Sequence, residues 1–209
     1  MTKEMPAANQ RSPFGRLVRA VSLPNVLTCV RILLIPVFLW LILSSGDWQD
    51  GGSALTHRWW ALATFILLMF TDQLDGFLAR KYEIITDFGK LADPIADKAL
   101  MISALVSLNI LGDLWWWVTI VIVIRELGIT VWRMVLARRG NVVPASKGGK
   151  LKTVLQTLAV TLYILPLSGV WDWAAHVSMA AALIVTVVTG IQYLLDSRRQ
   201  TPPTPSPAA

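Results

Sequence analysis

Charged side chains are scarce in this sequence, making up 15% of the 209 residues, whereas apolar side chains make up 55%. The mean hydropathy is accordingly high, at +0.57. A soluble domain of this size rarely needs so apolar a composition. Apolar stretches of about 20 residues can cross the hydrocarbon layer of a membrane as helices. Several such stretches occur here between short polar connections, so the composition favours a single multi-span membrane domain.

Cysteine and histidine are also rare. Cys29 is the only cysteine, which excludes an intrachain disulfide, and its apolar surroundings favour a packing role. The two histidines, His57 and His176, fall toward the predicted outer side of the membrane and are expected at the interface with water. The N-terminal segment 1–22 lacks a short apolar core followed by a small-residue cleavage site, so no cleaved signal peptide is expected.

The apolar stretches predict an all-α integral membrane protein with six transmembrane helices. The expected spans are Val26–Leu43, Trp59–Arg80, Gly89–Leu111, Leu114–Arg138, Lys152–Leu167 and Trp171–Leu195.

Three segments follow from this pattern. Residues 1–22 form a basic segment. Apolar residues recur there at helical spacing, with arginines between them, which favours a short interfacial amphipathic helix. The alternative is a disordered basic tail. Residues 23–197 form the membrane domain. Residues 198–209 form a proline-rich tail that is expected to be disordered.

The positions of Lys and Arg predict the orientation, because cytoplasmic connections retain positive charge. With both termini inside, Arg58 alone lies outside, and the cytoplasmic side holds Lys3, Arg11, Arg16, Arg19, Arg80, Lys81, Lys90, Arg138, Arg139, Lys147, Lys150, Lys152, Arg198 and Arg199. The formal net charge is +6, and the basic residues lie between apolar spans and not along one polar face. This distribution favours anionic lipid and phosphate as partners over nucleic acid. A multi-pass plasma-membrane protein is expected.

Tryptophans give a second indication of sidedness, since indoles favour the membrane interface. The predicted outer ends of the spans hold Trp48, Trp59, Trp60, Trp115, Trp116, Trp117, Trp171 and Trp173.

Four aspartates lie inside predicted spans, where carboxylates are costly unless they are paired or bound. Asp72 and Asp75 share one face of the second span, and Asp93 and Asp97 share one face of the third. Asp72 lies eight residues before Arg80, or about 12 Å inward at the rise of a helix. An antiparallel helix pair would bring all four carboxylates to a similar depth near the cytoplasmic side.

Carboxylates at such close quarters repel one another unless cations hold them. Oxygen ligands suit hard divalent ions, so a pair of Mg²⁺ or Mn²⁺ ions is predicted. Such ions can bridge the oxygens of a substrate phosphate during in-line displacement. Gly76 and Ala79 would let a nucleotide approach the helix backbone, and Arg80 can bind phosphate.

The pattern Asp-x2-Asp-Gly-x2-Ala-Arg-x8-Gly-x3-Asp-x3-Asp is complete from Asp72 to Asp97. It resembles the signature of the CDP-alcohol phosphotransferase family, whose members have a six-helix membrane architecture. The resemblance implies two metal ions held by Asp72, Asp75, Asp93 and Asp97, with Asp97 as general base. It also implies nucleotide contacts from Asp72, Asp75, Gly76, Ala79 and Arg80, and a homodimer.

Looser pieces are similar to phosphatidylglycerophosphate synthases within that family, over most of residues 23–156. They are the segments 23–31, 125–133 and 149–156. This similarity implies phosphatidyl transfer from CDP-diacylglycerol to sn-glycerol 3-phosphate with release of CMP. The acceptor dianion requires cations, and the candidates are Arg125, Arg133, Lys147, Lys150 and Lys152.

Several residues have two interpretations. Asn25 and Thr28 fit either the first turn of a helix, with Asn25 as its N-cap, or the nucleotide site. Arg31 fits either a salt bridge with an aspartate or a nucleotide contact. Arg125 fits either the acceptor phosphate or an ion pair with Glu126. Other acceptors, namely inositol phosphate or phosphatidylglycerol, and a cation transporter of a different class, are the alternative functions.

Overall fold

The computed structural model describes the backbone of residues 23–47, 49, 52–81, 87–138 and 147–199. Side chains are described at 28–47, 49, 52–72, 96, 98–137 and 151–197. The predictions for segment 1–22 and for residues 200–209 of the proline-rich tail lie outside this range.

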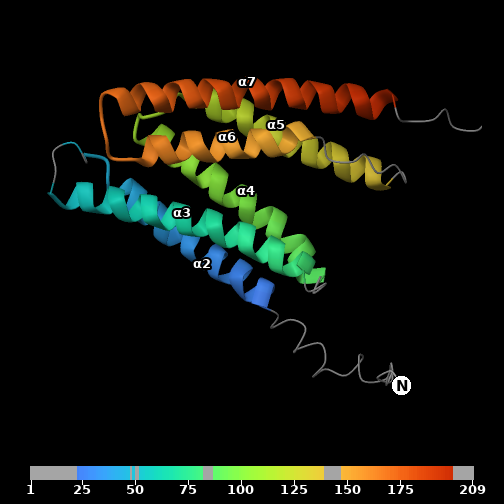
Figure 1. The fold of residues 1–209 in the computed structure, drawn as a ribbon, viewed down its shortest axis with the longest axis horizontal. Coiled ribbons are helices and arrows are strands. Elements are labelled where there is room, and N and C mark those ends of the chain that lie inside the picture. The colour runs from blue at the N-terminus through green and yellow to red at the C-terminus, as the bar shows by residue number, and fades with distance from the viewer. Residues whose placement is uncertain (1–22, 48, 50–51, 82–86, 139–146, 200–209) are drawn as a thin grey trace, which may run out of the picture. The chain divides into compact units, whose positions relative to one another are not determined.

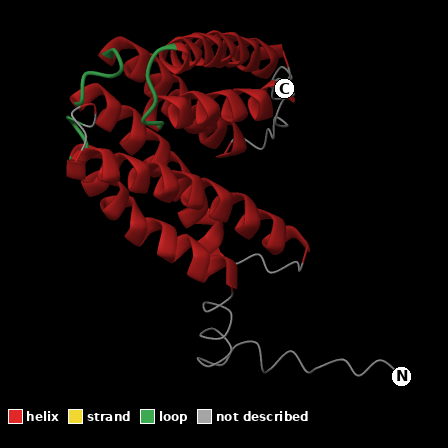
Figure 2. Cartoon of the chain, turned by 60° about the vertical axis from the view of Figure 1, so that its left-hand side comes forward, coloured by secondary structure: helices red, strands yellow, loops and turns green. Residues whose placement is uncertain are grey.

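Within the described residues the chain is helical and contains no strand (Figure 2). The helices are α2 (Leu23–Leu43), α3 (Gly52–Lys81), α4 (Asp87–Ile110), α5 (Trp116–Arg138), α6 (Lys147–Ile164) and α7 (Val170–Arg199). They correspond one to one with the six predicted spans.

Several helix ends differ by a few residues from the predicted span ends. α3 begins at Gly52 and not at Trp59, because its first turns carry polar residues that hydropathy does not detect. α2 begins at Leu23, so Asn25 lies in the first turn of the helix and not at its N-cap. α6 ends at Ile164, close to Pro166, since proline disfavours helical backbone in the residue before it.

The chain divides into an N-terminal unit, Met1–Ala104, and a C-terminal unit, Leu105–Ala209. In the N-terminal unit α2 and α3 lie side by side (Figure 1). Phe38 of α2 and Phe65 of α3 are fully buried, with ring centroids 5.8 Å apart. Ile35 and Ile42 recur at helical spacing around Phe38 and extend the same buried face.

In the C-terminal unit α7 lies along α6 and also contacts α5. Small side chains, including Ala159 and Ala182, are fully buried and let the helices approach closely. The last turn of α4 ends in a Schellman motif, because Gly112 N–H donates to the backbone carbonyl of Asn109 and Asp113 N–H donates to that of Leu108. Gly112 has a φ of 80°, which glycine adopts without strain.

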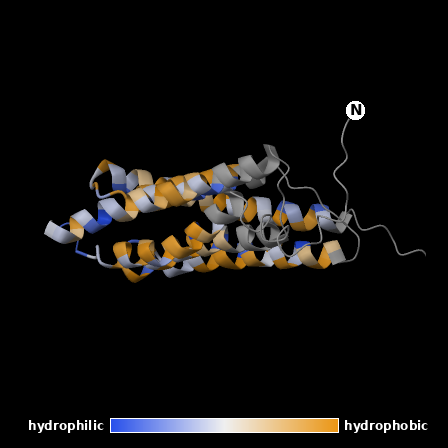
Figure 3. Cartoon of the chain, turned by 90° about the horizontal axis from the view of Figure 1, so that it is seen from below, coloured by the Kyte–Doolittle hydropathy of each residue, from blue (hydrophilic) through white to orange (hydrophobic). Residues whose placement is uncertain are grey.

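Many large apolar side chains point outward in both units, among them Leu33, Phe70, Ile124 and Ile184. Figure 3 shows apolar residues along much of the described helices. By length and composition, one stretch in the described part of the chain, Val170–Ser197, is long and apolar enough to cross a membrane. Thr28–Leu43, Lys98–Ile110 and Leu151–Ile164 are shorter apolar helices. The number of spans stays a prediction.

Candidate active site

The four signature aspartates lie on two consecutive helices. Asp72 and Asp75 are on α3, which ends at Lys81, and Asp93 and Asp97 are on α4, which begins at Asp87. Asp75 precedes the end of α3 by as many residues as separate Asp93 from the start of α4. At the rise of a helix this places both Cα atoms about 9 Å along the axis from the ends that flank residues 82–86. Asp75 and Asp93 therefore lie equally far along their own helices from these ends. That the four carboxylates share one depth stays a prediction.

Asp72 is the signature aspartate whose side chain is described, and it forms an ion pair. Its Oδ1 lies 2.5 Å from Nη1 of Arg31 on α2. The Arg31 side chain is fully buried, whereas that of Asp72 is 28% exposed. Of the two interpretations of Arg31, the structure shows the salt bridge, and the nucleotide contact stays a prediction.

The ion pair is compatible with a ligand role for Asp72. A carboxylate has two oxygens with several lone pairs, so an arginine on one oxygen leaves lone pairs that can bind a metal ion. Thr28, which is also fully buried, lies one turn before Arg31 on α2. The buried polar face of α2 therefore meets α3 at the position of the first signature aspartate.

The other signature residues are located by their backbone alone. Gly76, Ala79 and Arg80 lie in the last turns of α3, and Asn25 lies in the first turn of α2. Among residues with described side chains, no group of three or more His, Cys, Asp or Glu is arranged to hold a metal. The side chains of Asp75, Asp93 and Asp97 are outside that set, so the metal site stays a prediction.

A second polar cluster lies in the C-terminal unit, around Arg125 of α5. Arg125 Nε donates to the carbonyl of Thr186 at 3.0 Å, and Nη2 donates to Oγ1 of Thr189 at 2.9 Å. Its Nη1 lies 3.1 Å from Oε1 of Glu126. Arg125 thus joins α5 to α7, and its predicted alternative, an ion pair with Glu126, is present.

Lys152 of α6 completes the cluster. Its Nζ lies 2.5 Å from Oε1 of Glu126, the same oxygen that accepts from Arg125. The residue is buried, at 8% exposure. Gln156, one turn further along α6, donates to Oγ1 of Thr186 at 2.9 Å. The cluster therefore connects α5, α6 and α7 through one carboxylate and two threonines.

The other predicted phosphate ligands are Arg133, Lys147 and Lys150. Arg133 is exposed, and its guanidinium carbon lies 5.5 Å from the ring centroid of Tyr193 on α7, a cation–π contact. Lys147 and Lys150 lie in the first turn of α6, and their side chains are not described.

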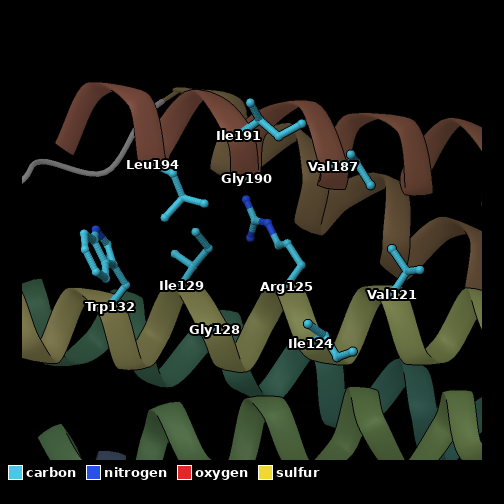
Figure 4. A pocket seen from close by; sticks show the side chains of 10 residues that line it. All are labelled: Val121, Ile124, Arg125, Gly128, Ile129, Trp132, Val187, Gly190, Ile191 and Leu194. Carbon is cyan, nitrogen blue, oxygen red and sulfur yellow. The ribbon is translucent and has the colours of Figure 1, made fainter. Parts of the chain in front are cut away.

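A cavity of about 450 Å³ adjoins the cluster between α5 and α7. Its lining is apolar apart from Arg125, which extends from α5 toward Gly190 of α7 (Figure 4). A Cβ built on Gly190 would lie 3.1 Å from both Cγ and Nε of Arg125. The absence of a side chain at Gly190 is what lets Arg125 pack directly on α7.

Sequence reasoning missed the partners on α7. Thr186, Thr189 and Gly190 lie in a long apolar run without a recognisable motif. A weak signal was present, because two threonines and a glycine within five residues of an apolar helix mark a face that accepts hydrogen bonds and close packing.

Comparisons with known proteins identify the family. A family model described as CDP-alcohol phosphatidyltransferase matches residues 21–188, which is most of the chain. The chain belongs to this family. Members are membrane-associated phosphatidyltransferases that generally depend on divalent metal ions. Family membership favours the transferase over the transporter alternative.

Relatives within the family carry more specific names. The chain is 50% identical over 181 residues to a probable phosphatidylglycerophosphate synthase of Mycobacterium tuberculosis, covering 87% of this chain and 84% of the relative. It is 39% identical over 180 residues to a CDP-diacylglycerol–glycerol-3-phosphate 3-phosphatidyltransferase of Bacillus subtilis, covering 82% and 93%. A CMP-forming cardiolipin synthase of Streptomyces coelicolor is 34% identical over 168 residues, covering 75% and 74%.

Proposed function

We propose that the chain transfers the phosphatidyl group of CDP-diacylglycerol to sn-glycerol 3-phosphate, giving phosphatidylglycerophosphate and CMP. The observation that carries this proposal is the similarity over more than four fifths of the chain to relatives named for this synthesis, at 50% and 39% identity. The complete aspartate signature supports the chemistry, and the basic residues of α5 and α6 support a phosphorylated acceptor.

In the proposed reaction, the primary hydroxyl oxygen of glycerol 3-phosphate forms a bond to the lipid-linked phosphorus. The bond between that phosphorus and the CMP oxygen breaks, and CMP leaves with the electron pair. The carboxylate of Asp97 takes the hydroxyl proton, which makes the attacking oxygen more nucleophilic. Its position on α4, one turn beyond Asp93, suits a residue that serves both a metal and the acceptor.

An all-carboxylate donor set fits divalent cations that prefer oxygen, either Mg²⁺ or Mn²⁺. Asp72, Asp75, Asp93 and Asp97 would hold two such ions. When bound, the ions supply positive charge against the pyrophosphate and its transition state. The pairing of Asp72 with Arg31 is compatible with this role, because it occupies one carboxylate oxygen and leaves lone pairs that can bind a metal ion.

The nucleotide would lie along the end of α3 and the start of α2. Gly76 and Ala79 present little side chain, and Arg80 can form parallel bonds with phosphate. On α2 the proposed contacts are Asn25, Thr28 and Arg31.

The acceptor phosphate would lie against α5 and α6. Its proposed ligands are Arg125, Arg133, Lys147, Lys150 and Lys152. A dianion of this kind gains charge-assisted hydrogen bonds from such donors, whereas an uncharged alcohol would not.

We further propose a multi-pass plasma-membrane protein with six spans and both termini in the cytoplasm. The active site would open to the cytoplasmic side. The exposed tryptophans near the starts of α3, α5 and α7 support interfacial ends for these helices. A homodimer is proposed from the family resemblance alone.

An acceptor panel tests the proposal. The purified full-length protein, in lipid vesicles with Mg²⁺ or Mn²⁺, is given CDP-diacylglycerol with glycerol 3-phosphate, phosphatidylglycerol or inositol phosphate, and CMP release is measured. Release with glycerol 3-phosphate, well above the acceptor-free rate, is expected. Release with phosphatidylglycerol alone would instead favour cardiolipin synthesis, the second candidate that the Streptomyces coelicolor relative raises.

A further inference from the structure

The Arg125 side chain is fixed from three directions. The carbonyl of Thr186 accepts from Nε, the hydroxyl of Thr189 accepts from Nη2, and the carboxylate of Glu126 accepts from Nη1. A guanidinium carries five N–H donors, so these bonds use three and leave one on each terminal nitrogen. Two such donors form the fork that binds phosphate oxygens in parallel. The described contacts therefore orient Arg125 without exhausting its donors.

Glu126 forms ion pairs with two cationic side chains through one carboxylate oxygen. Its Oε1 lies within hydrogen-bond distance of both Arg125 Nη1 and Lys152 Nζ. Two positive groups this close would repel each other without the carboxylate, most strongly where water is scarce. Arg125 and Lys152 are both largely buried, with side chains 15% and 9% exposed. Glu126 thus makes it possible for cations from α5 and α6 to lie side by side.

Gly190 sets the path of the Arg125 side chain. A Cβ at this position would lie 3.1 Å from both Cγ and Nε of Arg125, which is closer than most Cβ contacts in proteins. Because Cγ is near the backbone, the arginine would have to rotate away from the Thr186 carbonyl. Gly128, which lines the same cavity from α5, offers a control, since a Cβ there meets no atom within 4 Å.

We propose that Glu126, Thr189 and Gly190 are positioning residues for the acceptor phosphate site. Glu126 holds both Arg125 and Lys152 in place, and Thr189 and Gly190 hold Arg125. The inference rests on the proposed function. It assigns these three residues a role in acceptor affinity that acts through Arg125 and Lys152. The competing role is a purely structural connection between α5, α6 and α7, which would stabilise the fold without affecting the acceptor in particular.

The first test is steady-state kinetics of Glu126→Gln in the full-length protein, with glycerol 3-phosphate and CDP-diacylglycerol varied separately. Glutamine keeps the shape but removes the charge that holds the two cations together. The acceptor KM is expected to rise about tenfold, because two charge-assisted contacts lose their alignment. The KM for CDP-diacylglycerol and kcat should stay within about twofold. An unchanged or lowered acceptor KM would overturn the proposal. So would an increase in both KM values and a decrease in kcat by similar factors.

A double-mutant cycle shows whether Glu126 acts through Lys152. If it does, the increase in acceptor KM for Glu126→Gln combined with Lys152→Met is smaller than the product of the single increases. Independent effects that multiply would contradict the inference.

The α7 residues give a test that does not depend on the charged variant folding. Gly190→Ala should raise the acceptor KM about threefold with little effect on kcat, whereas Gly128→Ala should leave it unchanged. Thr189→Val should raise it similarly, and Thr189→Ser should restore it by returning the hydroxyl. Equal behaviour of the two glycine variants would contradict positioning by Gly190. CMP release by the wild type with glycerol 3-phosphate separates these outcomes from failure of the proposed function.

Discussion

The N-terminal and C-terminal units each place an arginine beside a carboxylate, Arg31 fully buried and Arg125 largely buried, but they do so in different ways. Arg31 pairs with Asp72 across α2 and α3, and that aspartate belongs to a strictly spaced signature. Arg125 pairs with its sequence neighbour Glu126, and its other partners come from α7, more than 60 residues away. The proposed catalytic aspartates thus stand at fixed spacing in the sequence, whereas the partners of the proposed acceptor ligand Arg125 come from a distant segment.

The comparison predicts that variants in the two units alter different kinetic constants. Changes at the aspartates should affect turnover and metal dependence, and changes around Arg125 should affect the acceptor KM. A variant of either unit that altered the constants of the other would break this division.

Asp97→Asn should have the largest effect. The asparagine cannot take the hydroxyl proton, so kcat should fall about a thousandfold, within the range of general-base catalysis. Binding of CDP-diacylglycerol, measured by equilibrium titration, should be retained in large part. Asp113→Asn makes the same chemical change in the α4–α5 connection and should keep normal turnover. Near-normal turnover in Asp97→Asn would remove the general-base role.

Arg125→Ala comes next and bears on the C-terminal unit. The acceptor KM should rise about thirtyfold, because a charge-assisted phosphate contact is lost. The KM for CDP-diacylglycerol should not change. Arg133→Ala is the matched variant two turns along α5, and its increase should be smaller, since Arg133 is exposed and contacts Tyr193. The opposite ranking would place the acceptor nearer Arg133.

Arg31→Met should act on stability and on metal dependence together. Losing the pair with Asp72 should cost about 2 kcal/mol, less than for a fully buried pair because Asp72 is partly exposed. The concentration of Mg²⁺ or Mn²⁺ giving half-maximal rate should also rise. Thermal unfolding and metal titration check both, and Arg31→Lys, which retains the charge, should lie between the wild type and Arg31→Met. An unchanged metal requirement would separate Arg31 from the metal site.

Gly112→Ala should have the smallest effect and should alter neither site. A φ of 80° strains any residue with a Cβ, so stability should fall by about 1 kcal/mol. Thermal unfolding should detect this decrease, while both KM values remain unchanged. Altered acceptor affinity would show that the α4–α5 connection influences the site.

The sequence predicted the six described helices well, because each contains an apolar stretch between polar connections. It placed the start of α3 seven residues late, since hydropathy marks the apolar part of a helix and not its full extent. A glycine at position 112 is consistent with a helix end, but the sequence does not show which hydrogen bonds close the turn.

The sites were predictable to different degrees. Asp72 and Asp75, and likewise Asp93 and Asp97, stand at helical spacing, so periodicity groups each pair on one face of its helix. That the two pairs meet stays a prediction. The surroundings of Arg125 were not predictable, because nothing in the sequence indicates which turn of α7 lies beside α5. Thr189 and Gly190 acquire their roles only from that contact.

The central claim, phosphatidyl transfer to glycerol 3-phosphate, is tested most directly by following the acceptor oxygen. Glycerol 3-phosphate labelled with ¹⁸O in its primary hydroxyl is incubated with CDP-diacylglycerol and the full-length protein, and the products are analysed by mass spectrometry. Attack by that hydroxyl predicts phosphatidylglycerophosphate that carries the label and CMP that does not. Labelled CMP, or no phosphatidylglycerophosphate, would contradict the account.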